Sequence, residues 1–477
     1  MIAGALLCAA FAQPAGAADP RYTVRFDHDR PQSIAVTIEW ADRDAGPRTL
    51  VIPRATPTTY SEQRYENFLV DLRAYGAHDE ALAVVRADGP RWTLGDGASV
   101  VARLEYRIDV ARMERDIHDA AASSRVRPGY LSLLAWSVLG YIDGMQQRGA
   151  DLDVDLPADW PVLTTLEPSL PLPRGHVHAH ARDYFALADS QIAGGPDLDL
   201  RRVDAAVPTY LASYVEAKVD RAAHADALCE AMRASRAYFG RAPFAHYVAI
   251  VEVLQPVSPQ HEYGFSQEHL DSGTFYYGVA DEIAGADKPF DAEQARYNFA
   301  HHIVHGWLPR RIYGQGNYPF TWEVAPVIDT VWFSEGFGQY VAAAALADAM
   351  PPGAGAAFRA ALLDRRFRKR LALAPDFIRR MPLVELSRVA SDRYALDFRI
   401  GRAVFSRGAL MAAEMDDLIG TRTHGKRSLR DAMRHLHDWA DASGRGFEID
   451  ELPKLIAAGT GVDTRAVMDR WLAPMQP

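Results

Sequence analysis

The chain has 477 residues, of which 48% are hydrophobic and 24% are charged. This is the composition of a globular protein with a large buried core, and the length predicts about two to four domains. The formal net charge of −10 excludes a strongly basic, nucleic-acid-binding protein, because phosphate groups require clustered Lys and Arg. The basic run at residues 364–370 is short and is interpreted as a solvated helix face.

The first 18 residues carry no charged side chain and contain an apolar run from Ile2 to Ala12. Small residues from Ala15 to Ala17 follow this run, as at a signal-peptide cleavage site. The run is too short to span a bilayer. We therefore expect residues 1–18 to be a signal peptide, the protein to be secreted or periplasmic, and no membrane span. Cys229 would then be the one remaining cysteine, so no intrachain disulfide is expected.

Residues 19–173 are expected to form an antiparallel β domain. Apolar and polar side chains alternate along several runs, which Gly, Pro and Asp separate. The runs are residues 22–26, 33–40, 49–52, 68–72 and 99–110. The domain is expected to end near Pro173, after a Pro-rich connection from Pro157.

Three alternating histidines follow this boundary: His176, His178 and His180. On a strand they would share one face, which permits a metal site. We favour three exposed surface histidines instead, because no carboxylate or Cys lies at ligand spacing.

The segment from Asp204 to Gly240 is Ala-rich and compatible with helix, and Tyr247 to Leu254 is a predicted strand. A polar stretch between glycines follows at residues 263–273 and contains Glu268 and His269. The stretch is either a surface turn with a buried polar pair or an edge strand that lines a cleft. In the second case Glu268 would pair with a substrate amine.

Residues 299–340 carry the pattern of a metal site. His301 and His305 are four positions apart, so a helix places both imidazoles on one face, as in HExxH zinc sites. Asp291 and Gln294 predict the start of this helix through a capping box, and Pro309 predicts its end.

A second helix is expected to begin near Ser334, with Glu335 in its first turn as the third metal ligand. Two His and one Glu match a catalytic zinc site, which keeps its fourth position for water. His302 stands where the HExxH motif has the glutamate that acts as general base. The alternative is that His301 and His305 are core or cap histidines.

Helical patterns dominate residues 346–477, which are expected to form a helical domain behind the metal site. The predicted helices are residues 356–373, 398–419, 428–441, 448–458 and 463–472.

Together these motifs resemble the glycyl aminopeptidase family of gluzincin zinc metallopeptidases. His301, His305 and Glu335 fall on the family's three zinc ligands, with 29 residues between the second His and the Glu. Other matching segments are residues 183–190, 239–244, 268–272, 332–337 and 425–434.

The resemblance covers about residues 20–475 and implies an α+β protein. Its parts would be an N-terminal antiparallel β domain, a thermolysin-like zinc-metallopeptidase domain at residues 174–345 and a C-terminal helical domain. The PDZ domain that often ends members of the family is expected to be absent.

Two departures from the family bear on chemistry. His302 replaces the general-base glutamate, and Phe405 replaces the tyrosine expected to stabilise the oxyanion, a hydrogen bond that phenylalanine cannot donate. Each contribution is worth about 10²-fold or more. A neutral His302 could accept the proton, and Tyr394 or Tyr313 could supply a phenol from elsewhere.

Three functions therefore stay open. The first is a zinc aminopeptidase that hydrolyses N-terminal residues from peptides, with Glu268 and His269 binding substrate and His302 handling the proton. The second is a pseudoenzyme that keeps the fold and zinc in order to bind a peptide or protein partner. In the third, His302 closes the fourth zinc position and the metal is structural. The two catalytic losses favour the second or third function over the first.

Overall fold

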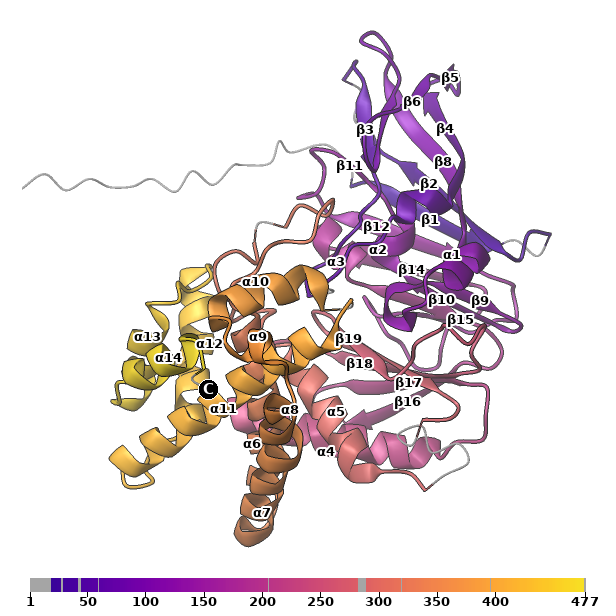
Figure 1. Ribbon diagram of the computed structural model, residues 1–477. Coiled ribbons are helices and arrows are strands. Elements are labelled where there is room, and N and C mark those ends of the chain that lie inside the picture. The colour runs from indigo at the N-terminus through magenta and orange to yellow at the C-terminus, as the bar shows by residue number, and fades with distance from the viewer. Residues whose placement is uncertain are drawn as a thin grey trace, which may run out of the picture.

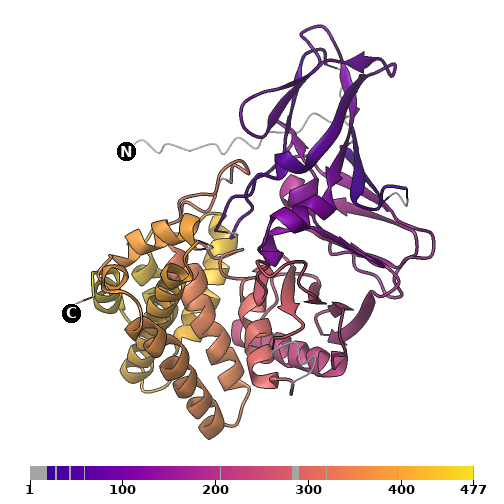
Figure 2. The same ribbon diagram turned by 45° about the vertical axis from the view of Figure 1, so that its right-hand side comes forward.

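The computed structural model of the chain describes residues 19–26, 29–41, 44–58, 60–204, 206–281, 289–318, 320–394 and 396–475. The predicted signal peptide lies outside the described residues. A β-rich part, a smaller sheet with its helices and a helical part follow one another along the chain (Figure 1). Turning the molecule shows the helical part beside the smaller sheet, with the β-rich part above both (Figure 2).

The β-rich part contains three sheets. The largest has the order β14-β12-β1-β2-β8-β4-β5, and the two smaller sheets have the orders β13-β15-β10-β9 and β11-β3-β7-β6. The predicted strands correspond to β1 (Arg21–Phe26), β2 (Ser33–Glu39), β3 (Arg48–Val51), β4 (Leu69–Gly76) and β8 (Val101–Asp109). In β1 and β2 every second side chain is buried, because successive side chains of a strand point to opposite faces.

The other strands of this part are mostly short. They are β5 (Ala81–Leu82), β6 (Val84–Arg86), β7 (Arg91–Leu94), β9 (Arg125–Arg127), β10 (Tyr130–Leu134), β11 (Tyr141–Ile142), β12 (Ala150–Asp155), β13 (Val162–Thr164), β14 (His176–Ala181) and β15 (Gln191–Gly194). The point predicted for the end of the β domain, Pro173, falls between β13 and β14. The pairing β1–β12 is parallel, whereas the other pairs in the largest sheet are antiparallel.

The three alternating histidines lie on one face of β14, as predicted, and are about half exposed. No carboxylate lies at ligand spacing in the sequence, but the structure places one beside each histidine. The Nδ1 atoms of His176, His178 and His180 lie 2.9, 3.1 and 3.0 Å from carboxylates of Asp155, Asp153 and Asp151 on the neighbouring strand. Strand pairing brings these residues together from 21 to 29 positions away in the chain, which residue spacing cannot reveal.

The smaller sheet has the order β16-β17-β18-β20-β19. Its strands are β16 (Asp199–Asp204), β17 (Thr209–Val215), β18 (Tyr247–Leu254), β19 (Phe265–Glu268) and β20 (Ser272–Gly278). The prediction of helix from residue 204 is therefore wrong for residues 209–215. Helix α4 (Arg221–Phe239) begins only at Arg221, where the Asp220 carboxylate accepts hydrogen bonds from Ala222 and Ala223.

Both faces of this sheet are covered. Strand β18 lies between two parallel neighbours and every residue in it is buried, as expected for a central parallel strand. Ala249, Val251 and Val253 belong to a core that includes α4 and helix α5 (Ala292–Val304). Val248 and Ile250 instead pack with residues of the β-rich part, such as Leu163. The sheet is thus held between helices and the β-rich part.

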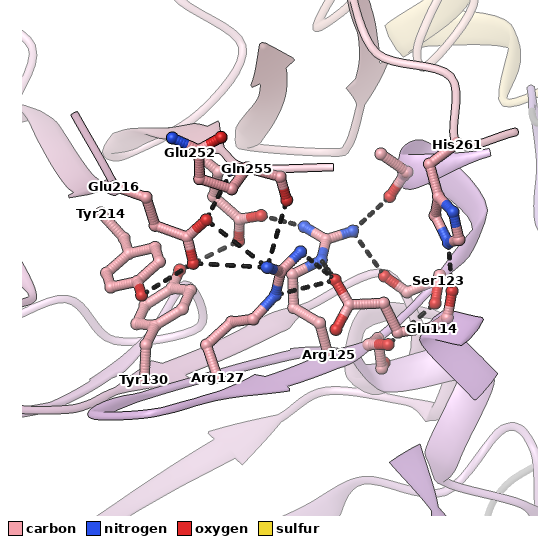
Figure 3. Close-up of polar contacts among 12 residues, drawn as sticks. Glu114, Ser123, Arg125, Arg127, Tyr130, Tyr214, Glu216, Glu252, Gln255 and His261 are labelled. Carbon is pink, nitrogen blue, oxygen red and sulfur yellow. Dashed lines mark hydrogen bonds and ion pairs between the residues drawn. The ribbon is translucent and has the colours of Figure 1, made fainter. Parts of the chain in front are cut away.

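A buried ionic network joins the β-rich part to β18 (Figure 3). Arg125 on β9 forms an ion pair with Glu252 on β18, and both side chains are almost fully buried. Tyr130 donates a 2.9 Å hydrogen bond to the same glutamate. Arg125 also donates to the backbone oxygen atoms of Ala120 and Ser123. These bonds fix the short helix η2 (Ala120–Ala122) against the smaller sheet.

The helical part begins with a π-helix, η3 (Trp332–Phe337), that runs into α6 (Gly338–Asp348). It continues with α7 (Pro352–Leu362), η4 (Leu363–Arg368), α8 (Lys369–Ala372), α9 (Asp376–Arg379), α10 (Leu383–Arg393), α11 (Phe398–Arg422), α12 (Leu429–Ser443), α13 (Leu452–Thr460) and α14 (Arg465–Leu472). The helices predicted from the sequence correspond to α7 and α8, α11, α12, α13 and α14. In the described part of the chain, no helix has the length and apolar character needed to cross a membrane.

Two glycines allow α11 to cross η3 closely. A Cβ atom on Gly336 would lie 2.5 Å from the Gly408 Cα atom, and one on Gly408 would lie 2.0 Å from the Trp332 carbonyl oxygen. Neither backbone approach leaves room for a side chain. The contact places Glu335 of η3 next to the residues of α11.

Candidate metal centre

His301, His305 and Glu335 converge on one point, as the sequence predicts. His301 lies in the last turn of α5, His305 is its C-cap and Glu335 lies on η3. The two Nε2 atoms are 3.1 Å apart, and they lie 3.5 and 3.6 Å from a Glu335 carboxylate oxygen. All three residues are buried, and their ligating atoms lie within 4.8 Å of one another.

Local backbone structure explains this convergence. Asp291 caps α5 by accepting a hydrogen bond from the Gln294 backbone, as predicted. The helix ends at Val304, earlier than Pro309, yet His305 keeps helical backbone angles and therefore stays on the same face as His301. Gly338 faces the two imidazoles, and a Cβ atom there would lie 3.4 Å from His305 Cε1.

Neighbouring groups orient the three side chains. His305 Nδ1 lies 2.7 Å from the Leu308 carbonyl oxygen, so Nδ1 carries the proton and the Nε2 lone pair faces the other two groups. The Tyr60 hydroxyl donates a 3.1 Å hydrogen bond to Glu335. The Gln339 amide nitrogen lies 2.8 Å from His301 Nε2, so a metal ion at that nitrogen would displace this hydrogen bond.

Burial controls the charge of these groups. Burial and the nearby Glu268 carboxylate raise the pKa of Glu335 to about 7. Burial and the neighbouring His305 and His302 hold the pKa of His301 well below its usual range. The neutral His301 imidazole, the His305 imidazole and the Glu335 carboxyl group form a donor set that suits zinc.

His302 lies beside Glu268. Its Nδ1 atom is 3.8 Å from a Glu268 carboxylate oxygen and has no hydrogen-bond partner. Burial and His305 lower the pKa of His302 to about 3, so the imidazole is neutral at pH 7. Glu268, His302 and His305 have ligating atoms within 4.8 Å of one another. The two candidate ligand groups, Glu268–His302–His305 and His301–His305–Glu335, therefore share His305.

Glu268 and His269 point in different directions. Strand β19 is an edge strand, and Glu268 at its end lines the pocket described below. His269 is buried outside that pocket, with Nδ1 3.4 Å from Asp189 and Nε2 in contact with the Gln191 amide. The structure thus brings Glu268, but not His269, to the candidate metal centre.

A pocket of about 550 Å³ opens onto the centre, a size typical of small-molecule sites. Its walls come from distant parts of the chain. They include Thr58, Tyr60, Asp119, Glu262, Glu268, His301, His302, Glu335, Arg366, Arg370, Tyr394, Arg402 and Phe405. The sequence reasoning missed Tyr60 and Asp119, because no motif marks a residue whose role depends on the packing of one part against another.

A phenol occupies the pocket beside Phe405. The rings of Tyr394 and Phe405 are stacked with centroids 5.4 Å apart, and both line the pocket. Gly401 makes room for this arrangement, since a Cβ atom there would lie 1.9 Å from the Tyr394 ring. Tyr313, the other phenol considered from the sequence, instead packs against Tyr318 at 4.8 Å and is not a lining residue.

Comparison with known proteins gives both a partial family match and a fold match. Residues 21–195 match the family model of the Peptidase M61 N-terminal domain. None of the curated proteins matches the chain. An aminopeptidase N family protein from Idiomarina loihiensis has a TM-score of 0.82 at 17% identity, over 96% of this chain and 76% of that chain.

Two other solved structures are similar over most of the chain. A mutant M1 zinc metallopeptidase from Deinococcus radiodurans, bound to a Tyr-Ser-Ala substrate, has a TM-score of 0.55 at 16% identity, over 96% of this chain and 94% of that chain. Native yeast LTA4 hydrolase has a TM-score of 0.56 at 10% identity, over 97% and 68%. The chain therefore has the α+β fold of M1 zinc metallopeptidases.

Proposed function

We propose that the protein is a zinc-dependent aminopeptidase that hydrolyses N-terminal residues from peptides. The observation that carries the proposal is the convergence of buried His301, His305 and Glu335 beside a pocket that Glu268 also lines. The shared fold with M1 zinc metallopeptidases and the match to the M61 N-terminal domain support it. The apolar segment at residues 1–18 supports action outside the cytoplasm, in the periplasm or after secretion.

The donor set fits zinc. Two imidazoles and one carboxylate are the ligands of many catalytic zinc sites, and the Leu308 and Tyr60 contacts are the outer hydrogen bonds that such ligands need. When bound, zinc would polarise the scissile carbonyl and lower the pKa of water.

Residues that line the pocket would bind the substrate amine, accept the proton and stabilise the oxyanion. The Glu268 carboxylate would pair with the substrate's N-terminal ammonium group. His302, neutral at pH 7, would accept a proton from the attacking water. The resulting imidazolium would be stabilised by Glu268, whose carboxylate lies 3.8 Å from His302 Nδ1. The Tyr394 hydroxyl would donate a hydrogen bond to the oxyanion in place of the tyrosine that Phe405 replaces.

Zinc content and turnover test this proposal together. We expect one zinc per chain in the natural protein and none in His301→Ala, together with zinc-dependent release of anilide from Gly- and Ala-anilides. His302→Ala should retain zinc and lose turnover by about 10²-fold or more. Equal zinc content in the natural protein and in His301→Ala would refute the metal centre.

The second candidate is a zinc-binding pseudopeptidase that holds a peptide without cleaving it. The replacement of the general-base glutamate by His302 and of the oxyanion tyrosine by Phe405 favours it. If the natural protein binds zinc and peptides without turnover, and if His302→Glu with Phe405→Tyr gains turnover, the second candidate is correct.

A further inference from the structure

Three arginine side chains line the same pocket as the candidate metal centre: Arg366, Arg370 and Arg402. Arg366 belongs to η4, Arg370 to α8 and Arg402 to α11. The helical part therefore contributes three guanidinium groups to one pocket.

These three arginines differ from their neighbours in having no acidic partner. Arg368 on η4 pairs with Asp364, and Arg399 on α11 pairs with Asp397 at 2.7 Å. In the part of the chain that the structure describes, no carboxylate oxygen lies within 4.0 Å of a guanidinium nitrogen of the pocket arginines. The pocket thus gathers positive charge that the described residues do not neutralise by pairing.

Arg366 makes contacts only with uncharged groups among the described residues. Its guanidinium group lies over the Tyr297 ring at 4.8 Å, and Nη1 is 3.4 Å from the Gln294 side-chain oxygen. Its Nε atom is buried without a hydrogen-bond partner. The Arg366 guanidinium group therefore has no acidic partner among the described residues, and an anion in the pocket would supply one.

Repulsion among the three pocket arginines also favours the binding of an anion. Partial burial and the neighbouring cations Arg366 and Arg402 lower the pKa of Arg370 to about 10. Arg370 is still charged at pH 7, and an anion placed among the three guanidinium groups would relieve their mutual repulsion.

Negative groups line other parts of the pocket. Glu268 lies at the end of β19, and Glu262 and Asp119 face the pocket from the loop before β19 and from the residue before η2. Apart from Glu335, a candidate metal ligand on η3, the acidic lining residues come from the two β-containing parts, whereas the three arginines come from the helical part. This charge separation complements a ligand with an amine and a carboxylate.

We propose that Arg366, Arg370 and Arg402 bind a carboxylate group of the peptide ligand. Guanidinium groups suit this role because their paired N–H donors match the two oxygen atoms of a carboxylate. The ligand class is then a short peptide, held by its amine at Glu268 and by its carboxylate at the arginines. This inference rests on the proposed function for the identity of the ligand as a peptide.

The carboxylate has two possible sources, the free C-terminus of a short peptide and an acidic side chain. Three peptides separate them: Gly-Ala-Ala, its C-terminal amide, and Gly-Asp-Ala amide. Each is prepared with a reduced first peptide bond, which a peptidase cannot cleave, so that calorimetry of the zinc-loaded full chain measures binding alone.

Amidation of Gly-Ala-Ala should weaken binding to the natural protein by about 10- to 100-fold, the range for hydrogen bonds to charged groups. In the double variant Arg370→Ala/Arg402→Ala, which keeps Arg366, the difference in affinity between the acid and its amide should shrink to about 3-fold or less. The matched control Arg368→Ala/Arg399→Ala removes two exposed arginines that already have acidic partners. It should keep the full difference in affinity between Gly-Ala-Ala and its amide. Recovery of affinity by Gly-Asp-Ala amide would identify a side-chain carboxylate as an equally good partner.

Equal binding of acid and amides by the natural protein would overturn the carboxylate site while leaving the proposed peptidase function intact. A loss of affinity that is the same for acid and amide in the double variant would also overturn it. Carboxylate-dependent binding without any turnover of cleavable peptides would instead support the site and refute the peptidase. Failure of every peptide to bind would refute both.

Discussion

The Tyr60 hydroxyl donates a 3.1 Å hydrogen bond to the carboxylate of Glu335, a residue 275 positions further along the chain. Tyr60 comes from the loop between β3 and β4, whereas Glu335 lies on η3. The β-rich part thus contributes directly to the orientation of a candidate metal ligand. Hydrogen bonds of this kind fix ligand geometry and raise metal affinity.

Tyr60→Phe should weaken zinc binding by about 10-fold, because it removes this hydrogen bond and keeps the ring. Competition with a chromophoric chelator measures the change. Tyr210→Phe, on β17 and outside the pocket, serves as the control and should leave zinc affinity unchanged. Unaltered affinity in Tyr60→Phe would show that Glu335 is held by other contacts.

Tyr394→Phe should lower kcat by about 10²- to 10³-fold with little change in KM, because the hydroxyl would act on the oxyanion and not on the bound substrate. Steady-state kinetics on Ala-anilide tests this prediction. The double variant Tyr394→Phe/Phe405→Tyr, which restores a phenol at the neighbouring stacked position, should regain part of the loss. A kcat equal to that of the natural protein would exclude Tyr394 from the chemistry.

Glu252→Ala should destabilise the protein by about 3–5 kcal/mol, because it removes the nearer carboxylate partner of buried Arg125 and leaves only Glu114, 3.8 Å from Nε. Urea unfolding followed by tryptophan fluorescence measures the loss. Asp441→Asn breaks the exposed pair with Arg241 and should cost less than about 1 kcal/mol. Similar costs for the two variants would mean that water reaches the network around Arg125.

Asp119 makes folding stability depend on pH. Burial and Glu262 raise the pKa of Asp119 to about 6 from 3.8, so between these values the folded state holds a proton that the unfolded state has released. The contribution of Asp119 to stability is therefore present below about pH 4 and is lost as the pH rises through 6.

Replacing this group by Asn should remove that dependence. Relative to the natural protein, Asp119→Asn should gain up to about 3 kcal/mol in stability between pH 4 and pH 7, as urea midpoints at both pH values would report. Asp397→Asn is the control, and its stability relative to the natural protein should change with pH in the opposite direction. The reason is that the Arg399 hydrogen bond lowers the pKa of Asp397. If the difference in stability between Asp119→Asn and the natural protein were the same at pH 4 and pH 7, Asp119 would not titrate in this range.

Sequence patterns predicted the elements whose own residues are enough to define them. Strand β18 matches its prediction residue for residue, since a continuous apolar run defined it. His301 and His305 meet because a helix fixes their spacing. Glu335 was placed in the first turn of the next helix from its helical pattern, and the family resemblance implied the same residue. The predicted start near Ser334 came two residues late, because η3 opens with π-helical geometry.

The remaining parts depend on packing between segments that are far apart in the chain. Strand β17 was interpreted as helix because Ala-rich sequence surrounds it, and its pairing with β16 and β18 outweighs that preference. Asp151, Asp153 and Asp155 reach the histidines of β14 through strand register. The positions of Arg370 and Tyr394 depend on how α8, α10 and α11 pack, which side-chain periodicity does not determine.

The pocket is assembled from the β-rich part, the smaller sheet and the helical part, so no single segment could be transplanted with its chemistry intact. A fragment of residues 196–475 would lack Arg125, the ion-pair partner of Glu252. It would also lack the Tyr60 hydroxyl that donates a hydrogen bond to Glu335. Such a fragment would retain the His301, His305 and Glu335 triad but would expose to solvent a sheet face that carries apolar Val248 and Ile250 together with Glu252.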